Sequence, residues 1–148
     1  LKLFLCGQGD NERIRELSRQ DTRIQVKGFL TEQELIELAQ NAFAFVNPRL
    51  NSHTPNKFNF PSKLLFYLAF NKPIISTKSS TIHPEYDDVL FWFEDETQRG
   101  FMKAIEKINS IDKQEYEKMV DKISNFSKKH SWDYQINRFI NFLNGGLN

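Results

Sequence analysis

Short apolar runs alternate with amphipathic stretches along the first 93 residues of the chain. Such runs are typical of β-strands, and runs without a polar face are typical of parallel strands that are covered by helices on both sides. The pattern predicts strands over residues 1–6, 23–28, 43–46, 73–76 and 89–93. Because the first run is apolar, we expect it to be a core strand, with Cys6 as a small buried side chain.

Capping residues and prolines predict helices between these strands. Asp10 follows a glycine turn and is expected to cap the first helix, and Thr31 with Glu34 has the spacing of a capping box. Pro61 suits the first turn of a third helix because its missing N–H would have no intrahelical partner, and Pro73 ends that helix. The alternation of strands and helices predicts the α/β class, with a Rossmann-like, doubly wound parallel sheet.

Only helices are predicted beyond the last strand. Asp95, Asp112 and Ser131 each precede a stretch with an apolar stripe at helical spacing, including the aromatic stripe of residues 132–143. We expect these extra C-terminal helices to pack against the sheet with their aromatic stripes in the core. We find no linker or internal repeat, so residues 1–148 are expected to form a single domain.

The longest break in the alternation of strands and helices is a polar loop over residues 47–59, which leads into the helix at Pro61. It follows the carboxyl end of a predicted strand, which is the edge where open α/β sheets bind ligands. A helix N-terminus beside that edge gathers free N–H groups, with Ser62 and Lys63 next to them, and could hold a phosphate or diphosphate. The alternative is an ordinary crossover helix, and the local pattern does not decide between them.

Composition narrows the classes of partner. With 39% hydrophobic residues, 26% charged residues and a net charge of +1, the chain resembles a soluble globular protein and lacks the basic excess of most nucleic-acid-binding domains. No apolar run approaches the roughly 20 residues of a transmembrane helix. His53, His83 and His130 have no metal-ligand spacing, so we expect no metal site. Since the first residues already form a predicted strand, we expect the chain to be a fragment of a longer protein.

Several segments together resemble the nucleotide-sugar-binding, C-terminal half of GT-B-fold glycosyltransferases, especially the retaining family 4. The resemblance covers most of the chain, and the segments over residues 47–49 and 60–77 are close to the pattern of bacterial surface-polysaccharide members. It is carried by Leu3-Phe4-Leu5-Cys6-Gly7-Gln8-Gly9, Val26-Lys27-Gly28-Phe29-Leu30, Asn47-Pro48-Arg49 and the block from Phe60-Pro61-Ser62-Lys63-Leu64-Leu65 to Lys72-Pro73-Ile74-Ile75-Ser76-Thr77.

The resemblance implies transfer of a sugar, with retention and without a metal, from a nucleoside-diphosphate sugar to a surface glycan such as O-antigen or capsule. The donor is a substrate, expected to be UDP-linked, so no cofactor is expected. An N-terminal domain outside this chain would bring the glycan or lipid-linked acceptor, and the isolated fragment would be inactive. The location implied is the cytoplasm, with peripheral attachment to the inner face of the membrane left open.

The resemblance also implies which residues bind the donor. The nucleobase would rest against the backbone of Gly28, Phe29 and Leu30. The diphosphate would be held at the helix entrance, with Arg49 and Lys63 as cations, by Arg49, Asn59, Phe60, Pro61, Ser62 and Lys63. No catalytic residue is assigned.

One departure from the family pattern leads to a second hypothesis about the function. The family commonly has two glutamates eight residues apart, and the second, which binds the ribose, would fall at Phe66. Phe66 could contact the donor or could belong to the core. The alternative function is therefore a decayed, non-catalytic domain that binds another protein. A nucleotide-sugar epimerase of the same fold would need cleft carboxylates that the sequence does not reveal.

Overall fold

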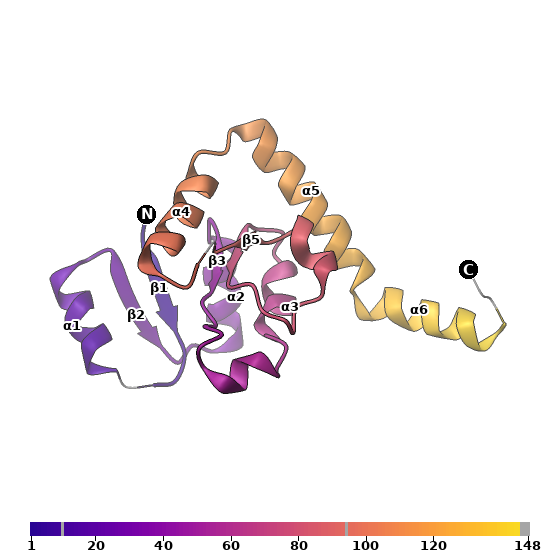
Figure 1. The fold of residues 1–148 in the computed structure, drawn as a ribbon, viewed down its shortest axis with the longest axis horizontal. Helices are drawn as coiled ribbons and strands as arrows, with labels where there is room; N and C mark the ends of the chain where they lie inside the picture. Colours follow the sequence, from indigo (N-terminus) through magenta and orange to yellow (C-terminus); the bar gives the residue numbers. More distant parts are fainter. Residues whose placement is uncertain (10, 94, 146–148) are drawn as a thin grey trace. The chain divides into compact units, whose positions relative to one another are not determined.

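The structure, a computed structural model, describes residues 1–9, 11–93 and 95–145 (Figure 1). The chain divides into two compact units, Leu1–Asn41 and Ala42–Asn148, which we call the N-terminal and C-terminal units. Each unit contains its own small sheet, and every strand pair in both sheets is parallel. The predicted α/β class with parallel, Rossmann-like strand pairing is confirmed.

The N-terminal unit contains two strand-helix repeats. Its elements are β1 (Leu3–Cys6), α1 (Glu12–Gln20), β2 (Ile24–Gly28) and α2 (Glu32–Gln40). Asn11 caps α1 by accepting the Ile14 N–H at 3.2 Å, whereas the predicted cap Asp10 lies outside the described residues. The predicted capping box of α2 is confirmed, because Thr31 Oγ1 accepts the Glu34 N–H and the Glu34 carboxylate accepts the Thr31 N–H at 2.8 Å.

The prediction that β1 is a buried strand is wrong. Leu3 and Phe4 are 39% and 40% exposed, and Cys6 is exposed rather than buried. In the N-terminal unit β1 pairs with β2 alone, and a two-stranded sheet leaves much of its surface without a covering layer. Lys27 covers part of Phe4, with its Nζ 5.5 Å from the centre of the ring.

The C-terminal unit holds a three-stranded sheet in the order β3-β4-β5, with helices between and after the strands. The elements are β3 (Phe45–Asn47), the 3-10 helix η1 (Thr54–Lys57), α3 (Lys63–Leu68), β4 (Ile74–Ser76), the 3-10 helix η2 (Pro84–Asp88), β5 (Phe91–Trp92), α4 (Gln98–Asn109), α5 (Lys113–Lys129) and α6 (Trp132–Leu143). The strands β4 and β5 lie within their predicted ranges, and β3 overlaps its predicted range and extends one residue beyond it.

The centre of this unit is β4, which is buried on both faces. Ile74 packs in a cluster with Leu64 of α3 and Ile123 of α5, whereas Ile75 packs in a second cluster with Ala104 of α4. Successive strand residues point to opposite faces, so helices cover both sides of the strand. This confirms the prediction of a buried strand over residues 73–76.

The three C-terminal helices begin close to their predicted starts. Asp112 caps α5 by accepting the Glu115 N–H at 2.8 Å, and Ser131 caps α6 by accepting the Tyr134 N–H. The predicted cap Asp95 is wrong for α4. Thr97 is the cap there, and the Asp95 carboxylate instead accepts the Thr97 N–H at 3.0 Å.

The expectation that the aromatic stripe of α6 belongs to the core is wrong. The helix continues from the end of α5 away from the sheet (Figure 1). Trp132 is 83% exposed, and the other large apolar side chains of α6 that are exposed are Tyr134, Ile136, Phe139, Ile140, Phe142 and Leu143. The helix α6 is amphipathic, as the pattern predicted, but the described residues do not cover its apolar stripe.

Candidate functional site

Two polar side chains lie at the edge of the sheet where β3 and β4 end. Because the two strands are parallel, their last residues, Asn47 and Ser76, are direct register partners. Both side chains are buried, and Asn47 Nδ2 donates to Ser76 Oγ at 2.9 Å. The Thr77 N–H then donates to the Asn47 carbonyl at 3.3 Å. These bonds fix the points from which the two following loops leave the sheet.

The loop over residues 47–59 is held by side-chain hydrogen bonds. The Arg49 guanidinium donates twice to Asn56 Oδ1, at 3.0 and 2.8 Å. The Asn51 N–H donates to a Glu96 carboxylate oxygen at 2.6 Å, and Asn51 Nδ2 donates to the Lys78 carbonyl at 2.7 Å. The loop is therefore tied both to itself and to the segments after β4 and β5.

A narrow hollow lies between this loop and the segment after β4. Its lining residues are Asn47, Arg49, Asn56, Asn59, Pro61, Thr77, Ser79, Thr81 and Ile82. The space between these residues is too narrow for a water molecule. The lining combines amides, hydroxyls and one guanidinium, and none of the lining residues is acidic. Such a set of donors suits an oxygen-rich or anionic group.

Three of the residues predicted to bind the donor, Arg49, Asn59 and Pro61, come together in this hollow. Hydroxyl groups join its two sides. Thr81 Oγ1 donates to the Asn59 carbonyl at 3.2 Å and lies 3.0 Å from Ser79 Oγ.

The helix entrance differs from the prediction. The helix α3 has only six residues and begins at Lys63, so Pro61 precedes it instead of lying in its first turn. The Leu64 and Leu65 N–H groups donate to the carbonyls of Pro61 and Ser62, at 2.9 and 3.1 Å. Among the described residues, the Ser62 and Lys63 N–H groups have no backbone acceptor. The entrance therefore offers fewer free amides and a smaller dipole than a full-length helix.

The exposure of the predicted residues around this entrance varies. Ser62 and Lys63 are exposed, whereas Pro61 is buried. Phe60 lies at the surface, with its ring centre 5.8 Å from that of Tyr86. Phe66 is half-buried and packs edge-on against Phe70, with 5.0 Å between the ring centres, and it does not line the hollow.

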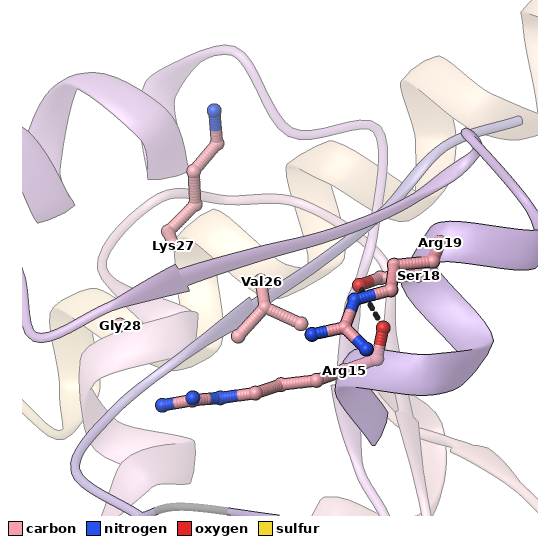
Figure 2. A pocket seen from close by; sticks show the side chains of 6 residues that line it. All are labelled: Arg15, Ser18, Arg19, Val26, Lys27 and Gly28. Carbon is pink, nitrogen blue, oxygen red and sulfur yellow. Dashed lines mark hydrogen bonds between the residues drawn. The ribbon is translucent and has the colours of Figure 1, made fainter. Parts of the chain in front are cut away.

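The residues predicted to contact the nucleobase lie in the N-terminal unit, at the end of β2. Gly28 has a φ of +66° and lines a hollow of about 420 Å³ between α1 and β2. Arg15 and Arg19 lie on the same side of the strand as Val26, and Lys27 points to the other side (Figure 2). Phe29 is 73% exposed and Leu30 is half-buried.

Within the described part of the chain, no group of three or more His, Cys, Asp or Glu side chains is arranged to hold a metal ion. No helix there combines the length and apolar character needed to cross a membrane.

A family model described as glycosyl transferases group 1 matches residues 1–110, which is most of the chain. The chain belongs to this family. The resemblance to glycosyltransferases that the sequence motifs indicate is thus confirmed at the level of the family. A comparison with curated proteins gives no match.

In this member of the glycosyl transferases group 1 family, motif reasoning assigned no binding role to the polar residues that follow β4, although Thr77 ends one of the motif blocks. Thr77, Ser79 and Thr81 line the same hollow as Arg49. Their signal in the sequence is the group of hydroxyl residues at positions 76, 77 and 79–81, at and directly after the end of a buried apolar strand. The rule that parallel strands end at one edge, which selected the loop over residues 47–59, applies equally to this second loop.

Proposed function

We propose that residues 1–148 form the donor-binding domain of a retaining, metal-independent glycosyltransferase of the family 4 type. The enzyme moves a sugar from a nucleoside-diphosphate sugar, with UDP as the expected nucleotide, to a surface glycan. The observation that carries this proposal is the match to glycosyl transferases group 1 over residues 1–110, which spans all the proposed binding residues. The acceptor is bound by another part of the enzyme.

The proposed diphosphate site is the edge of the sheet beside α3. Arg49 is the cation of the hollow, and a guanidinium matches pairs of phosphate oxygens. Ser62 and Lys63 are exposed next to Pro61, where a hydroxyl, an ammonium group and free amides can bind the same anion. As the sugar departs, negative charge develops on the diphosphate, and fixed donors at this position stabilise it. The chemistry needs no metal ion if these donors supply the charge stabilisation.

The proposed nucleobase contact is the backbone after β2. Gly28 adopts a left-handed conformation, and a Cβ at this position would meet no atom within 4 Å, so a planar ring can approach its backbone closely. Phe29 is exposed and can offer an apolar face to the base.

Titration of the ¹⁵N-labelled chain with UDP and UDP-sugars tests this function. We expect the amide signals of Gly28 and of residues 59–63 to shift, while those of α6 stay in place. ADP and GDP added in parallel would reveal a different base preference. Unmoved signals at both places with every nucleotide diphosphate would contradict the proposal.

A second candidate function is a decayed domain that only binds a protein partner. The observation that favours it is Phe66, which replaces the expected ribose-binding glutamate with an aromatic side chain packed against Phe70. Phe66→Glu should raise nucleotide affinity if donor binding has been lost by decay. Higher affinity in this variant, together with a full-length protein that transfers no sugar from any donor, would favour the decayed domain.

A further inference from the structure

Within the part of the chain that the structure describes, the hydroxyl of Thr77 has no hydrogen-bond partner, although the residue is only 3% exposed. Among the described residues, the only other buried side-chain atom in this state is Trp92 Nε1. A buried polar group that loses its water without gaining a partner destabilises the folded protein. Most buried polar groups in proteins are satisfied, so this hydroxyl requires an explanation.

The position of Thr77 suggests an explanation for its unpaired hydroxyl. The residue lines the hollow at the end of β3 and β4 with Arg49 and Asn59, and this hollow has no room for a water molecule that could satisfy the hydroxyl. The neighbouring hydroxyls are already bonded to each other, with Ser79 Oγ 3.0 Å from Thr81 Oγ1. Thr77 therefore differs from its neighbours in having its side-chain hydrogen-bonding capacity unused.

The hydrogen bonds that hold Arg49 in the hollow are ones that an anionic ligand can replace. Its guanidinium is held by the neutral amide oxygen of Asn56, at 3.0 and 2.8 Å. A phosphate is a stronger acceptor for a guanidinium than an amide, because both partners of the new bond are charged. Movement of Arg49 from Asn56 to a phosphate would open the hollow beside Thr77.

We propose that Thr77 is a binding residue for the diphosphate of the donor, with its hydroxyl donating to a phosphate oxygen that Arg49 also binds. This inference rests on the proposed function, since it adds a residue to the same site. It assigns the hollow to a phosphate group because the lining carries one cation and no carboxylate. In the absence of ligand, the unpaired hydroxyl costs stability that the bound phosphate restores.

The proposal predicts effects of opposite direction on stability and on binding. Thr77→Val removes the hydroxyl with little change of shape, so the melting temperature of the free chain should stay the same or rise. The affinity for UDP should fall by roughly 10-fold or more, as expected for the loss of a hydrogen bond to a charged group. Calorimetric titration with UDP and thermal melts of the whole chain measure both effects.

Three controls separate this role from a general disturbance. Thr77→Ser keeps the hydroxyl and should bind UDP as the unmodified chain does. Trp92→Phe removes the other unpaired buried donor, which does not line the hollow, and should leave UDP affinity unchanged. Uridine lacks phosphate, so its affinity should not differ between the unmodified chain and Thr77→Val.

Each result decides between the two proposals. If the unmodified chain and Thr77→Val bind UDP equally, the role of Thr77 is refuted and the proposed function stands. If Thr77→Val loses both stability and affinity, the hydroxyl is structural and the inference also fails. If the unmodified chain binds neither UDP nor any other nucleoside diphosphate, the proposed function and this inference are both wrong.

Discussion

Two adjacent leucines of α3 differ completely in their surroundings. Leu64 is fully buried against Ile74 and Ile123, whereas Leu65 is 50% exposed. Leu64→Ala should lower the free energy of unfolding by about 2–5 kcal/mol, because it leaves a cavity in the larger cluster of the core. The matched change Leu65→Ala should cost about 0.5 kcal/mol or less. Urea unfolding measures both, and equal losses would contradict the assigned faces of the helix.

Asp21 and Arg23 form an exposed ion pair in the N-terminal unit. Hydrogen bonds from the Arg23 side chain and backbone N–H lower the pKa of Asp21 to about 2. The carboxylate is thus favoured in the folded chain, and this contribution to stability is present above the unfolded pKa of about 3.9. It is lost as the pH falls through that value toward 2. Because both side chains are exposed, the contribution is small and is screened by salt.

An NMR titration of the Asp21 carboxyl carbon checks this pair. We expect a midpoint near 2 in the unmodified chain. In Arg23→Gln the midpoint should move up toward the ordinary value of about 3.9. An unchanged midpoint in this variant would mean that Arg23 does not cause the shift.

Ser62 and Lys63 are neighbours, but they should contribute to donor binding in different ways. Ser62→Ala and Lys63→Ala should each weaken UDP binding, and only the loss at Lys63 should shrink as salt is added, since a charge is screened whereas a hydroxyl is not. Titrations at low and high ionic strength measure the difference. A loss at Lys63 that does not depend on salt would contradict a charge contribution.

At the scale of whole elements, the sequence predicted what depends on neighbouring residues and missed what depends on distant ones. The caps at Thr31, Asp112 and Ser131 were predictable because a cap needs only residues within one helical turn. The early end of α3 could not be read from the pattern. It ends at Leu68, and the chain then turns through Asn71, which has a left-handed φ of 53°.

Burial and the composition of the site also depend on distant residues, and the sequence predicted them less well. The pattern of α6 gives an apolar stripe but does not say what covers it, so the stripe was wrongly assigned to the core. In the site, Arg49 and Pro61 stood out by residue type and position. The Thr77 hydroxyl was missed because only the packing around it leaves it without a partner.

The exposed stripe of α6 should add little to stability. Phe139 is 61% exposed, whereas Ile123 of α5 is fully buried. Phe139→Gln should therefore change the melting temperature by no more than about 1–2 °C, because surface changes cost about 0.5 kcal/mol at most. Ile123→Ala should lower it clearly. A large loss in Phe139→Gln would show that the stripe is covered in the chain in solution.

For the whole molecule, the core is distributed unevenly between the two units. Over residues 1–9, 11–93 and 95–145, thirteen hydrophobic residues are buried, and Ala39 is the one among them that belongs to the N-terminal unit. The strands of that unit are half-exposed, while β4 is buried along its full length. A small unit that buries little apolar surface has little free energy to offset the entropy of folding.

Hydrogen exchange should reveal this difference. In the described part of the chain, the amides of β1 and β2 should exchange through local opening, well before those of β4, whose exchange should require global unfolding of the C-terminal unit. Because the base of a nucleotide is proposed to bind at Gly28 and its diphosphate beside Thr77, a bound nucleotide should slow exchange in β2 and also in β4. Mass action stabilises the unit that holds the ligand. Equal protection of β2 and β4 in the free chain would contradict this account and would mean that the N-terminal unit is stabilised by more than its own core.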